Sequence, residues 1–314
     1  VRFEHDRMEL VSNTQDHQKS PTSTYYTFND FFPSVNATYR LSDKQQLRLA
    51  YGKSVNRPEF REVSSSVFYD FDLSGNIQGN PNLTACYVHN VDLRYELYPS
   101  KSELVSVALF YKNFQNPIEW TYTVAGGTDP IYSYKNAKGA YSYGVELDIK
   151  KSLDFIGVPD LSLVFNGALI KSKVNFDKGD QEKNRPMQGQ SPYIINTGLF
   201  YQNSRIGLSA ALLYNRIGKR IVGVGRSMGS VDDNVRIPDS YEMPRNAVDI
   251  NLSKKIGSHF ELKLSVKDLL GESVVFKQFE DGIRLNNGTV KNAEEVTRCY
   301  KPGRNYSLSV TYNF

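Results

Sequence analysis

The stretch that decides the fold is the end of the chain, which reads Tyr-Ser-Leu-Ser-Val-Thr-Tyr-Asn-Phe at residues 306–314. Apolar or aromatic residues occupy every second position, and small polar residues lie between them. Because successive side chains of a β-strand point to opposite faces, this segment has one apolar face and one polar face. Such an edge promotes aggregation in a soluble domain, whereas a transmembrane β-barrel places lipid on one face and water on the other.

Composition is compatible with that interpretation. The chain has 314 residues and a mean hydropathy of -0.48. No run approaches the roughly 18 apolar residues of a membrane helix, so a helical membrane protein is excluded. Barrel strands do not raise the mean hydropathy, because their apolar residues alternate with polar ones. The 21 Tyr and 17 Phe suit a membrane–water boundary.

Alternating segments recur along the whole chain. We count about twelve, each close to the roughly 10 residues that cross a bilayer. They lie near residues 1–10, 35–41, 47–51, 91–97, 105–111, 145–149, 161–169, 195–201, 206–214, 248–252, 260–266 and 306–314. Charged residues on these segments fall opposite the apolar positions, namely Asp92, Arg94, Glu96, Glu146, Asp148 and Lys150. A charge facing lipid costs about 2–4 kcal/mol near the midplane, so we expect them to face an aqueous lumen.

Short and long connections between these segments alternate strictly along the chain. The short ones are residues 42–45, 99–102, 154–160, 203–205 and 257–259. The long ones, which we expect to be polar loops, are residues 11–24, 55–85, 125–139, 177–189, 225–240 and 271–297. This alternation is typical of a barrel with periplasmic turns and extracellular loops, and it places Phe314 on the periplasmic side. The fold prediction is therefore an all-β, transmembrane, antiparallel up-and-down barrel of about twelve strands.

Other chemistries lack support. His5, His17, His89 and His259 lie in unrelated segments, so no metal site or cofactor is expected. Catalytic motifs are absent, which indicates a protein that is not an enzyme. A net charge of +4 without a basic block predicts no nucleic-acid partner. Cys86 and Cys299 are far apart, and we expect two free thiols.

Several motifs resemble one family. An Arg-Pro step at Arg57 and Pro58 ends one strand, and Gly-Asn-Pro-Asn-Leu at residues 79–83 leads to the next. Residues 91–96 and 110–119 follow, and Asp-Leu-Leu at 268–270 and Lys-Pro-Gly-Arg at 301–304 precede the terminal strand. Together these segments resemble the barrel of TonB-dependent outer-membrane receptors, particularly those of Bacteroidetes. Physically, Pro58 forces an extended residue before it and ends the ladder, while Gly79 and Pro81 shape a turn.

The resemblance implies a location and partners. The family's barrels have 22 strands and an amino-terminal plug that contacts TonB, so residues 1–314 would be the carboxy-terminal part of one barrel domain, without the plug and early strands. It implies active uptake of a bulky ligand, such as a siderophore, oligosaccharide or peptide, across the outer membrane of a Gram-negative cell. The implied partners are outer-membrane lipid, TonB through the plug, the barrel-assembly machinery and a surface lipoprotein.

Candidate site residues lie in the long loops and at the terminus. Bulky polar ligands suit aromatic and charged loop residues, which here are Arg57, Glu59, Tyr69, Asp70, Trp120, Tyr122 and Tyr132. For Arg57 and Glu59, loop architecture is the stronger interpretation. An assembly signal is expected in the terminal strand at Tyr306, Leu308, Val310, Tyr312 and Phe314.

Two alternatives remain open. A self-contained twelve-stranded channel or barrel enzyme has the right strand number. A soluble β-sandwich would explain the alternation of any one strand but not the segregation of long loops. Closure separates the first alternative from a partial barrel. Part of a larger barrel should form an open, curved sheet, whereas a complete small barrel should pair its first strand with its last.

Overall fold

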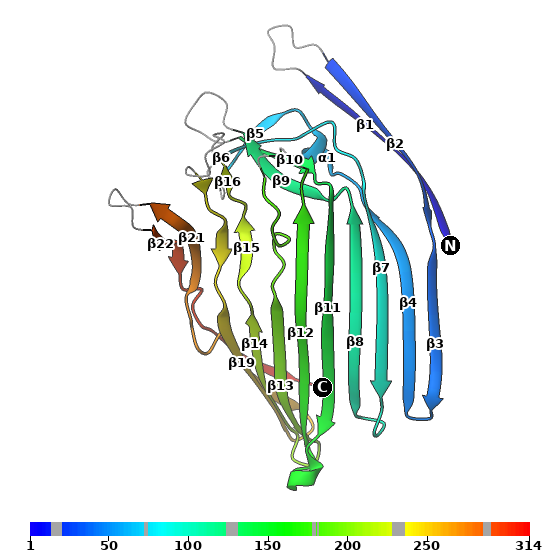
Figure 1. The fold of residues 1–314 in the computed structure, drawn as a ribbon. Coiled ribbons are helices and arrows are strands. Elements are labelled where there is room, and N and C mark those ends of the chain that lie inside the picture. Colours follow the sequence, from blue (N-terminus) through cyan, green and yellow to red (C-terminus); the bar gives the residue numbers. More distant parts are fainter. Residues whose placement is uncertain are drawn as a thin grey trace.

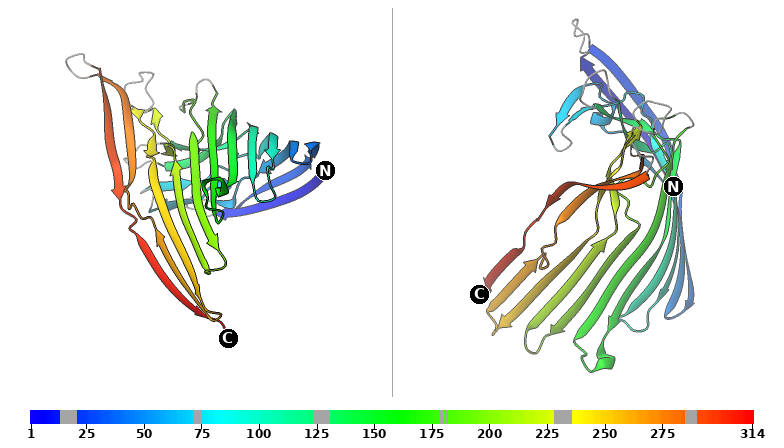
Figure 2. Two further views of the ribbon diagram at one scale, coloured as in Figure 1. Left: turned by 90° about the horizontal axis from the view of Figure 1, so that it is seen from below. Right: turned by 60° about the vertical axis from the view of Figure 1, so that its left-hand side comes forward.

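The computed structural model describes residues 1–13, 21–71, 75–123, 131–177, 180, 182–227, 236–284 and 290–314. Its main feature is one eleven-stranded antiparallel sheet, hereafter the wall, which curves strongly in the views of Figures 1 and 2. In spatial order its strands are β23 (Asn305–Tyr312), β20 (Phe260–Lys267), β19 (Arg245–Ile256), β14 (Leu208–Ile217), β13 (Tyr193–Asn203), β12 (Leu161–Asn175), β11 (Gly139–Ser152), β8 (Leu104–Gln115), β7 (Cys86–Leu97), β4 (Gln45–Asn56) and β3 (Ser34–Ser42). Each strand lies beside its predecessor in the wall, as in an up-and-down barrel.

Cross-strand register gives the wall two distinct faces. One row of direct partners runs Ala37, Leu49, Leu93, Leu109, Val145 and Leu169 across six strands. Members of this apolar row are well exposed, with 51% for Leu49 and 63% for Leu169. Apolar side chains at such exposure need a non-aqueous surrounding, which is what lipid supplies. We call this face outward.

The other face, which we call inward, is polar and more sheltered. Ser106 is fully buried, and Glu96 is 5% exposed, although both lie on strands whose outward residues are exposed. Two hollows, of about 290 and 480 Å³, are lined mainly by inward residues of β12, β13, β14, β19, β20 and β23. Crowding and hollows on this face are expected for the concave side of a curved sheet. The predicted separation of charge from lipid is therefore present.

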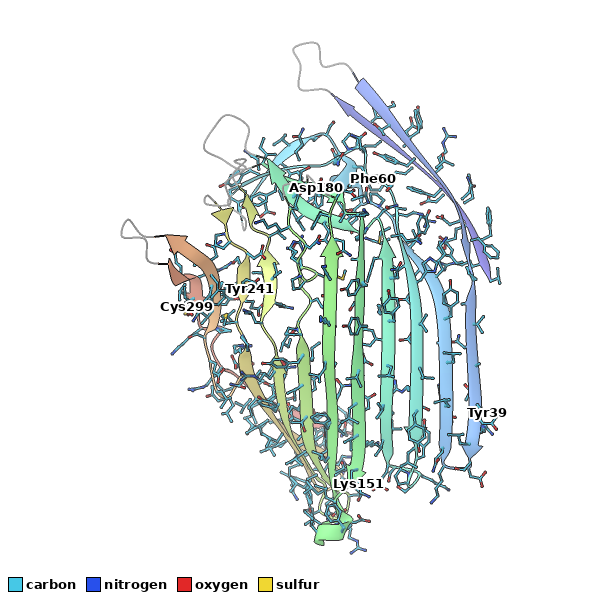
Figure 3. The ribbon with its side chains drawn as sticks, viewed as in Figure 1. Tyr39, Phe60, Lys151, Asp180, Tyr241 and Cys299 are labelled. Atoms are coloured by element: carbon cyan, nitrogen blue, oxygen red, sulfur yellow. The ribbon has the colours of Figure 1, made fainter. Side chains whose placement is uncertain are left out.

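Short turns gather at one end of the wall, and smaller elements gather at the other (Figure 1). The 3₁₀ turn η1 (Asp154–Ile156) belongs to the turn end. The opposite end carries a four-stranded sheet of β5 (Val67–Asp70), β6 (Gly75–Gln78), β10 (Ile131–Asn136) and β9 (Ile118–Thr123), together with the short helix α1 (Phe60–Val63). We call this sheet and helix the cover. In Figure 3, Phe60 and Asp180 lie at the cover end and Lys151 at the turn end.

Two further assemblies extend beyond the wall. The hairpin of β1 (Arg2–Asn13) and β2 (Pro21–Phe32) leads directly into β3. A second sheet contains β15 (Arg220–Gly223), β18 (Ser240–Glu242), β21 (Val274–Arg284) and β22 (Val290–Tyr300). The short pair β16 (Arg226–Ser227) and β17 (Arg236–Ile237) completes the elements among the described residues.

The structure corrects the expectation of unstructured long loops. Residues 271–297 are mostly the paired strands β21 and β22, and residues 55–85 contain α1, β5 and β6. Residues 11–24 include the ends of β1 and β2. Polar residues are frequent in these segments, so composition alone made them look like loops. The strand count changes slightly too, because β1 pairs with β2 and the wall itself has eleven strands.

The open-sheet prediction is confirmed. Among the described residues β23 pairs with β20 and β1 pairs with β2, so the first and last strands do not meet. Both cysteines are free, with Cys86 buried and Cys299 exposed. In the described part of the chain, no helix is long and apolar enough to cross a membrane. The same residues hold no cluster of metal-binding side chains.

Candidate functional site

The cover is built on a tight approach between α1 and the turn at residues 79–83. Glu59 caps the helix, its backbone N–H accepted by the Glu62 carboxylate at 2.9 Å in a capping box. A side chain at Gly79 would place its first carbon 2.3 Å from the Ser64 carbonyl oxygen. Only glycine fits there, so Gly79 allows Asn80 to donate its backbone N–H to the Glu62 carbonyl.

Two asparagines then join this turn to the strands of the cover. Asn80 donates its side-chain amide to the carbonyl of Tyr134, 2.9 Å away on β10. Asn136 accepts the backbone N–H of Thr84 at 2.8 Å and donates to the Asn116 carbonyl, also at 2.8 Å. Each bond satisfies a backbone group that leaves a regular ladder, which stabilises the irregular path of the chain.

A buried ion pair holds the segment after β12 against the cover. Arg185 donates to the Glu119 carboxylate at 2.7 Å, and each side chain is 7% exposed or less. Arg185 also exchanges backbone hydrogen bonds with Val174 and lies over the Phe176 ring. Two buried opposite charges stabilise each other only in this close geometry, so the contact fixes where the segment lies.

A second, more exposed set of ion pairs also joins the segment after β12 to the cover. Lys135 on β10 reaches Asp180 at 2.8 Å and Glu182 at 3.1 Å. The hydrogen bond from Lys135 holds the pKa of the Asp180 carboxyl below its usual value. Because the two carboxylates outweigh the cost of burial, the pKa of Lys135 is raised. Both shifts favour the charged pair at neutral pH.

The cover brings together most of the predicted ligand residues. Trp120 on β9 packs against Tyr134 and Tyr132 of β10, with ring centroids 4.6 and 6.3 Å apart. Asp70 and Tyr69, which is 52% exposed, lie on β5 of the same sheet. Tyr69 pairs with Asn76, which pairs with Ile131, so its side chain lies on the face opposite to that of Tyr132. The backbone of Tyr122 pairs with Tyr132, but its side chain lies outside the described residues. The result is a surface of aromatic rings with carboxylates beside it.

Carboxylates affect the aromatic cluster electrostatically. Burial, followed by the nearby charges of Glu62 and Glu59, raises the pKa of the Tyr134 hydroxyl, which therefore stays a neutral hydrogen-bond donor. Burial likewise raises the pKa of Glu62 itself, and Glu59 adds repulsion. A surface of neutral hydroxyls and rings suits a ligand with both π-faces or apolar faces and polar edges.

Arg57 is not part of this aromatic surface. Its guanidinium pairs with Asp30 at 2.7 Å and Glu4 at 3.0 Å, and it lies 5.4 Å from the Phe28 ring centre. These contacts tie the β1–β2 hairpin to the end of β4. Glu59 caps α1, as described above. Both geometries agree with loop architecture, while ligand contact by either residue stays a prediction.

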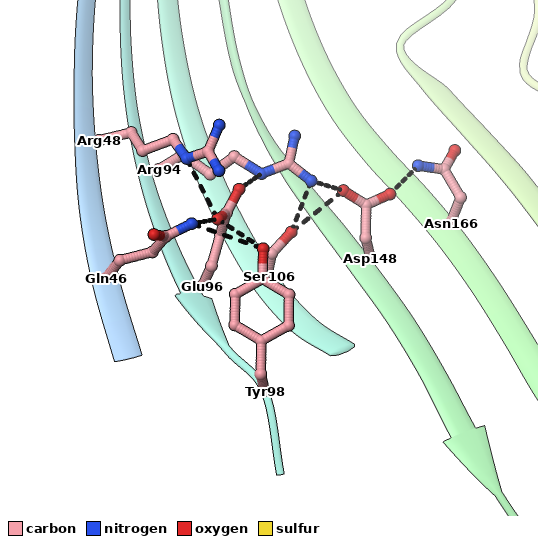
Figure 4. A network of polar contacts seen from close by, with 8 residues as sticks. All are labelled: Gln46, Arg48, Arg94, Glu96, Tyr98, Ser106, Asp148 and Asn166. Carbon is pink, nitrogen blue, oxygen red and sulfur yellow. Dashed lines mark hydrogen bonds and ion pairs between the residues drawn. The ribbon is translucent and has the colours of Figure 1, made fainter. Parts of the chain in front are cut away.

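The inward face of the wall carries a continuous polar belt, shown in part in Figure 4. Arg94 donates to Asp148 at 2.8 Å and to Ser106 at 2.9 Å, and it also pairs with Glu96. Direct cross-strand partners extend the belt over seven strands, namely Gln46, Glu96, Ser106, Asp148, Asn166, Asn196 and Asn215. Asn166 donates to Asp148, and Asn215 donates to Asn196 at 2.6 Å.

Sequence reasoning placed Arg94, Glu96 and Asp148 on the inward face but did not identify the belt as one network. The belt could have been predicted from the short turns, which set the register that pairs its residues across each hairpin. The Glu119–Arg185 pair was also missed, because its partners are separated by 66 residues. The predicted terminal residues lie on β23 and just after it. The side chain of Phe314 is fully exposed to solvent, and its ring contacts the ring of Tyr312 edge-on.

An open barrel wall with an apolar exterior, a polar interior and a structured cover at one end defines an outer-membrane barrel protein. Residues 1–269 match the family described as TonB dependent receptor-like, beta-barrel. The chain therefore belongs to the TonB-dependent receptor β-barrel family, which confirms the resemblance inferred from its motifs. No curated protein matches the chain in sequence.

Solved structures show the same fold. The ferric enterobactin receptor PfeA of Pseudomonas aeruginosa (G324V mutant) is 17% identical with a TM-score of 0.58, the match covering 94% of this chain and 42% of that one. The ferric-catecholate import receptor Fiu of K12 E. coli is 14% identical with a TM-score of 0.61, covering 98% and 41%. The siderophore receptor PirA of Acinetobacter baumannii is 16% identical with a TM-score of 0.56, covering 93% and 41%. The chain thus spans about two fifths of the length of each receptor.

Proposed function

We propose that this chain forms the wall and cover of a TonB-dependent outer-membrane transporter that actively takes up a bulky ligand. The observation that carries the proposal is the belt on the inward face, which lies opposite an exposed apolar face. A wide, empty, water-filled channel would have no need for such a closely connected network, whereas a plug domain could dock on it. The plug would lie elsewhere in the longer protein and contact TonB, so that the proton-motive force could rearrange it.

The ligand class that the cover favours is aromatic or amphipathic. Trp120, Tyr132 and Tyr134 offer ring faces and edges on one face of the cover sheet. The similar solved structures are, by their own descriptions, receptors for ferric enterobactin, siderophores and ferric catecholates. We therefore place an iron siderophore first, with oligosaccharides and peptides behind it. A surface lipoprotein is a further proposed partner.

Uptake by cells tests this function. A strain lacking the full-length protein should lose iron uptake from a ferric catecholate, and restoring the gene should restore uptake only when TonB is present. Uptake that persists without TonB would contradict the proposal. Binding can be followed through the fluorescence of Trp120, the one Trp in this chain, as the difference between wild type and Trp120→Phe.

Topology is tested separately by cysteine labelling of intact cells. We expect the cover to face outward from the cell and the short turns to face the periplasm. Phe71, 86% exposed beside the cover, and Ser204, exposed in the turn after β13, are suitable sites. Cys299 is itself a free, exposed thiol, so the variants are made in a Cys299→Ser background. An impermeant reagent should label Phe71→Cys and not Ser204→Cys. The reverse pattern would show that the orientation is wrong.

Assembly provides another prediction. An exposed strand edge can be recognised by β-augmentation, with pockets that contact alternate residues such as Val310, Tyr312 and Phe314. If Phe314 is part of such a signal, its deletion from the full-length protein should lower the amount inserted in the outer membrane. Inserted molecules should melt almost normally, because one ring contributes only about 1.5–3 kcal/mol of burial. Unchanged membrane levels would leave Phe314 a packing role alone.

A further inference from the structure

Four neighbouring wall strands are all interrupted at one level near the cover end. β14 resumes as β15 after residues 218–219, and β18 leads into β19 through residues 243–244. Residues 268–273 separate β20 from β21, and residues 301–304 separate β22 from β23. We call these four interruptions the crease, and the sheet of β15, β18, β21 and β22 beyond it the upper sheet. In the left view of Figure 2 the chain changes direction between β22 and β23.

The crease interrupts the ladder without exchanging its two faces. β14 and β19 pair up to Ile217 and Arg245, and β15 and β18 pair again from Arg220 and Glu242, so both strands omit the same number of residues. Of the other two interruptions, the one between β20 and β21 is longer by two residues, which is an even difference. Because side chains alternate with a period of two, the inward face of the wall continues into the upper sheet. A sheet that keeps its faces but loses its ladder at one level can bend there.

Strained backbone and bridging side-chain bonds are concentrated in the crease. Gly271 and Gly303 have φ of +60° and +86°, and Asp268 has φ of +54°, a left-handed backbone that a residue other than glycine seldom adopts. Arg304 donates to the two carbonyl oxygens of residues 269–270, at 2.8 and 3.3 Å. These bonds keep the two longer interruptions together. Strained residues of this kind collect at hinges and switches.

Side chains stabilise the upper sheet as one unit. Arg220 donates twice to the Glu242 carboxylate, at 2.9 and 2.7 Å. The rings of Tyr241 and Phe279 pack edge to face with centroids 5.7 Å apart, and the Lys219 ammonium lies 4.7 Å from each. Together with the ladders of β18 with β21 and of β21 with β22, these contacts connect all four strands, so we expect bending at the crease rather than within the sheet. Figure 3 places Tyr241 and Cys299 in this sheet.

One segment holds the upper sheet against the wall. Residues 185–191, which we call the strap, lie between β12 and β13. The backbone N–H of Gly189 donates to the carbonyl of Ile221 on β15 at 2.8 Å, and the side-chain amide of Gln188 donates to the carbonyl of Val222 at 2.9 Å. The strap is itself fixed, because its first residue is tied to β12 and to the cover by the contacts described above.

The strap and the crease also hold polar atoms that are incompletely satisfied. Among the described residues, five buried side-chain atoms have no hydrogen-bond partner. Three of them belong to the strap or the crease, namely Arg185 Nε, Gln188 Oε1 and Asp268 Oδ1. A buried polar atom without a partner destabilises the arrangement that buries it. Moving the upper sheet away from the strap would expose Gln188 Oε1 to water, so the position seen here is favoured by less than its hydrogen bonds suggest.

We propose that the upper sheet pivots at the crease as one body, and that the strap is the latch that holds it in the position described here. Release breaks the hydrogen bonds that Gly189 and Gln188 donate, while the ladders inside the upper sheet stay intact. Since the upper sheet continues the inward face of the wall, the pivot changes the width of the barrel mouth at the cover end, beside β14, β19, β20 and β23. The motion requires no ligand, and the inference rests on the proposed function only for what the mouth admits.

The pivot is tested on full-length protein in lipid nanodiscs by double electron–electron resonance between two spin labels. One label is placed on Cys299 of the upper sheet, which is exposed, and the other on Ser204→Cys in the turn after β13. A reference pair within the wall joins Lys171→Cys on β12 to Ser204→Cys in a Cys299→Ser background, and the buried Cys86 is left in place. We expect two distance populations for the first pair and one narrow population for the reference pair.

A matched pair of substitutions tests the latch. Gln188→Glu keeps the size of the side chain, but a carboxylate cannot donate to the Val222 carbonyl and is repelled by it. Gln190→Glu adds the same charge to the strap at a residue that donates only to the Ser191 carbonyl. We expect Gln188→Glu to raise the ratio of released to held upper sheet on the order of tenfold, and Gln190→Glu to leave it unchanged. Equal effects would assign the change to charge and contradict the latch, and a single narrow distance in both wild type and Gln188→Glu would overturn the pivot.

Amide hydrogen exchange distinguishes a pivot from unfolding. In Gln188→Glu the Gly189 amide should exchange on the order of tenfold faster than in wild type, because its acceptor moves away with β15. The amides of the β21–β22 ladder should keep their protection. Loss of protection throughout that ladder would show that the upper sheet unfolds instead of pivoting, and unchanged Gly189 exchange would contradict the latch.

Failure of this inference and failure of the proposed function are distinguishable, because neither measurement involves transport. A protein whose upper sheet pivots but that shows no TonB-dependent uptake contradicts only the transport function. TonB-dependent uptake by a protein whose upper sheet stays in one position contradicts only the pivot.

Discussion

The wall and the cover are both built on β-sheets, yet different contacts stabilise them. In the wall, one pattern recurs across the sheet, because outward positions are predominantly apolar and the charged side chains of the strands lie inward. Inward Phe110, Val164 and Phe200 are exceptions. The cover has no such repeat. It contains a parallel pairing of β6 with β10, and unique contacts such as Glu119 with Arg185 fix its position. The difference shows that a wall can be specified by period alone, whereas a cover needs particular pairs of residues.

The largest effect is expected from a substitution that destabilises the cover and leaves the wall unchanged. Arg185→Ala leaves Glu119 buried and unpaired, which should cost about 3–5 kcal/mol of local stability. Amide hydrogen exchange on the full-length protein should show faster exchange in β9 and β10 and unchanged exchange in β11 and β12.

A double variant provides the control. Glu119→Leu with Arg185→Met replaces both charges with apolar groups of similar size, so much of the protection should return. If the double variant exchanged as fast as Arg185→Ala, the ion pair would not be what holds the cover.

The next effect tests the wall. Leu49→Arg puts a charge on the outward face near the middle of the apolar band and should cost about 2–4 kcal/mol. Ala50→Arg, one residue along β4, places the same charge inward and opposite Asp92, and it should change stability by less than about 0.5 kcal/mol. Unfolding by urea in lipid vesicles measures both, and equal costs would show that the two faces are not distinct.

A smaller effect sharpens the comparison within the inward face. Arg94→Met leaves Asp148, Ser106 and Glu96 without a shared donor and should cost about 1–3 kcal/mol in the same unfolding assay. Arg48, which is 51% exposed and pairs with Glu96 alone, is the matched control. Arg48→Met should cost no more than about 1 kcal/mol. A greater cost for Arg48→Met would contradict the central place of Arg94 in the belt.

The smallest effect is the pH dependence of the cover. The folded-state pKa of Asp180 is lowered by Lys135, so this contribution is present above the carboxyl's unfolded pKa of about 3.9 and is lost as pH falls through the lower, folded value. The pKa of Lys135 is raised, so its contribution is lost only as pH rises through a value above about 10.4. Protease resistance of the cover should therefore be level between those limits and fall in stronger acid, by no more than about 1 kcal/mol.

Asp180→Asn should reduce that acid transition. Glu182 also pairs with Lys135, so the variant keeps one ion pair at this position. An acid transition of unchanged size in the variant would assign it to other groups.

The sequence was sufficient for the wall because the wall is local. Leu47, Leu49 and Tyr51 alternate whatever the rest of the chain does, and the short turns bring each strand beside its predecessor. Even the contact between Gln46 and Glu96 follows once those two strands are paired in register. The expected short turns and the open sheet are therefore both present.

The cover could be predicted only in part. Trp120 and Tyr132 were expected in neighbouring loop segments, and their contact agrees with a shared surface. The pairing of Asn76 with Ile131 had no local signal, because it joins segments far apart in the chain. The capping box of Glu59 and Glu62 did have one, since two glutamates three residues apart can cap a helix. A contact with one distant partner leaves no alternating pattern in the sequence, so it cannot be predicted from such patterns.

Unbroken register between β8 and β11 also limits how this protein can change over time. From Gly139 to Lys150, every residue of β11 has a direct partner on β8, and no bulge interrupts the ladder. Removing one residue there would turn every following side chain to the opposite face, so lysines would meet lipid and leucines would meet water. Removing two would preserve the faces. Insertions and deletions in the descendants of this gene should therefore occur in the connections, or in the strands by even numbers.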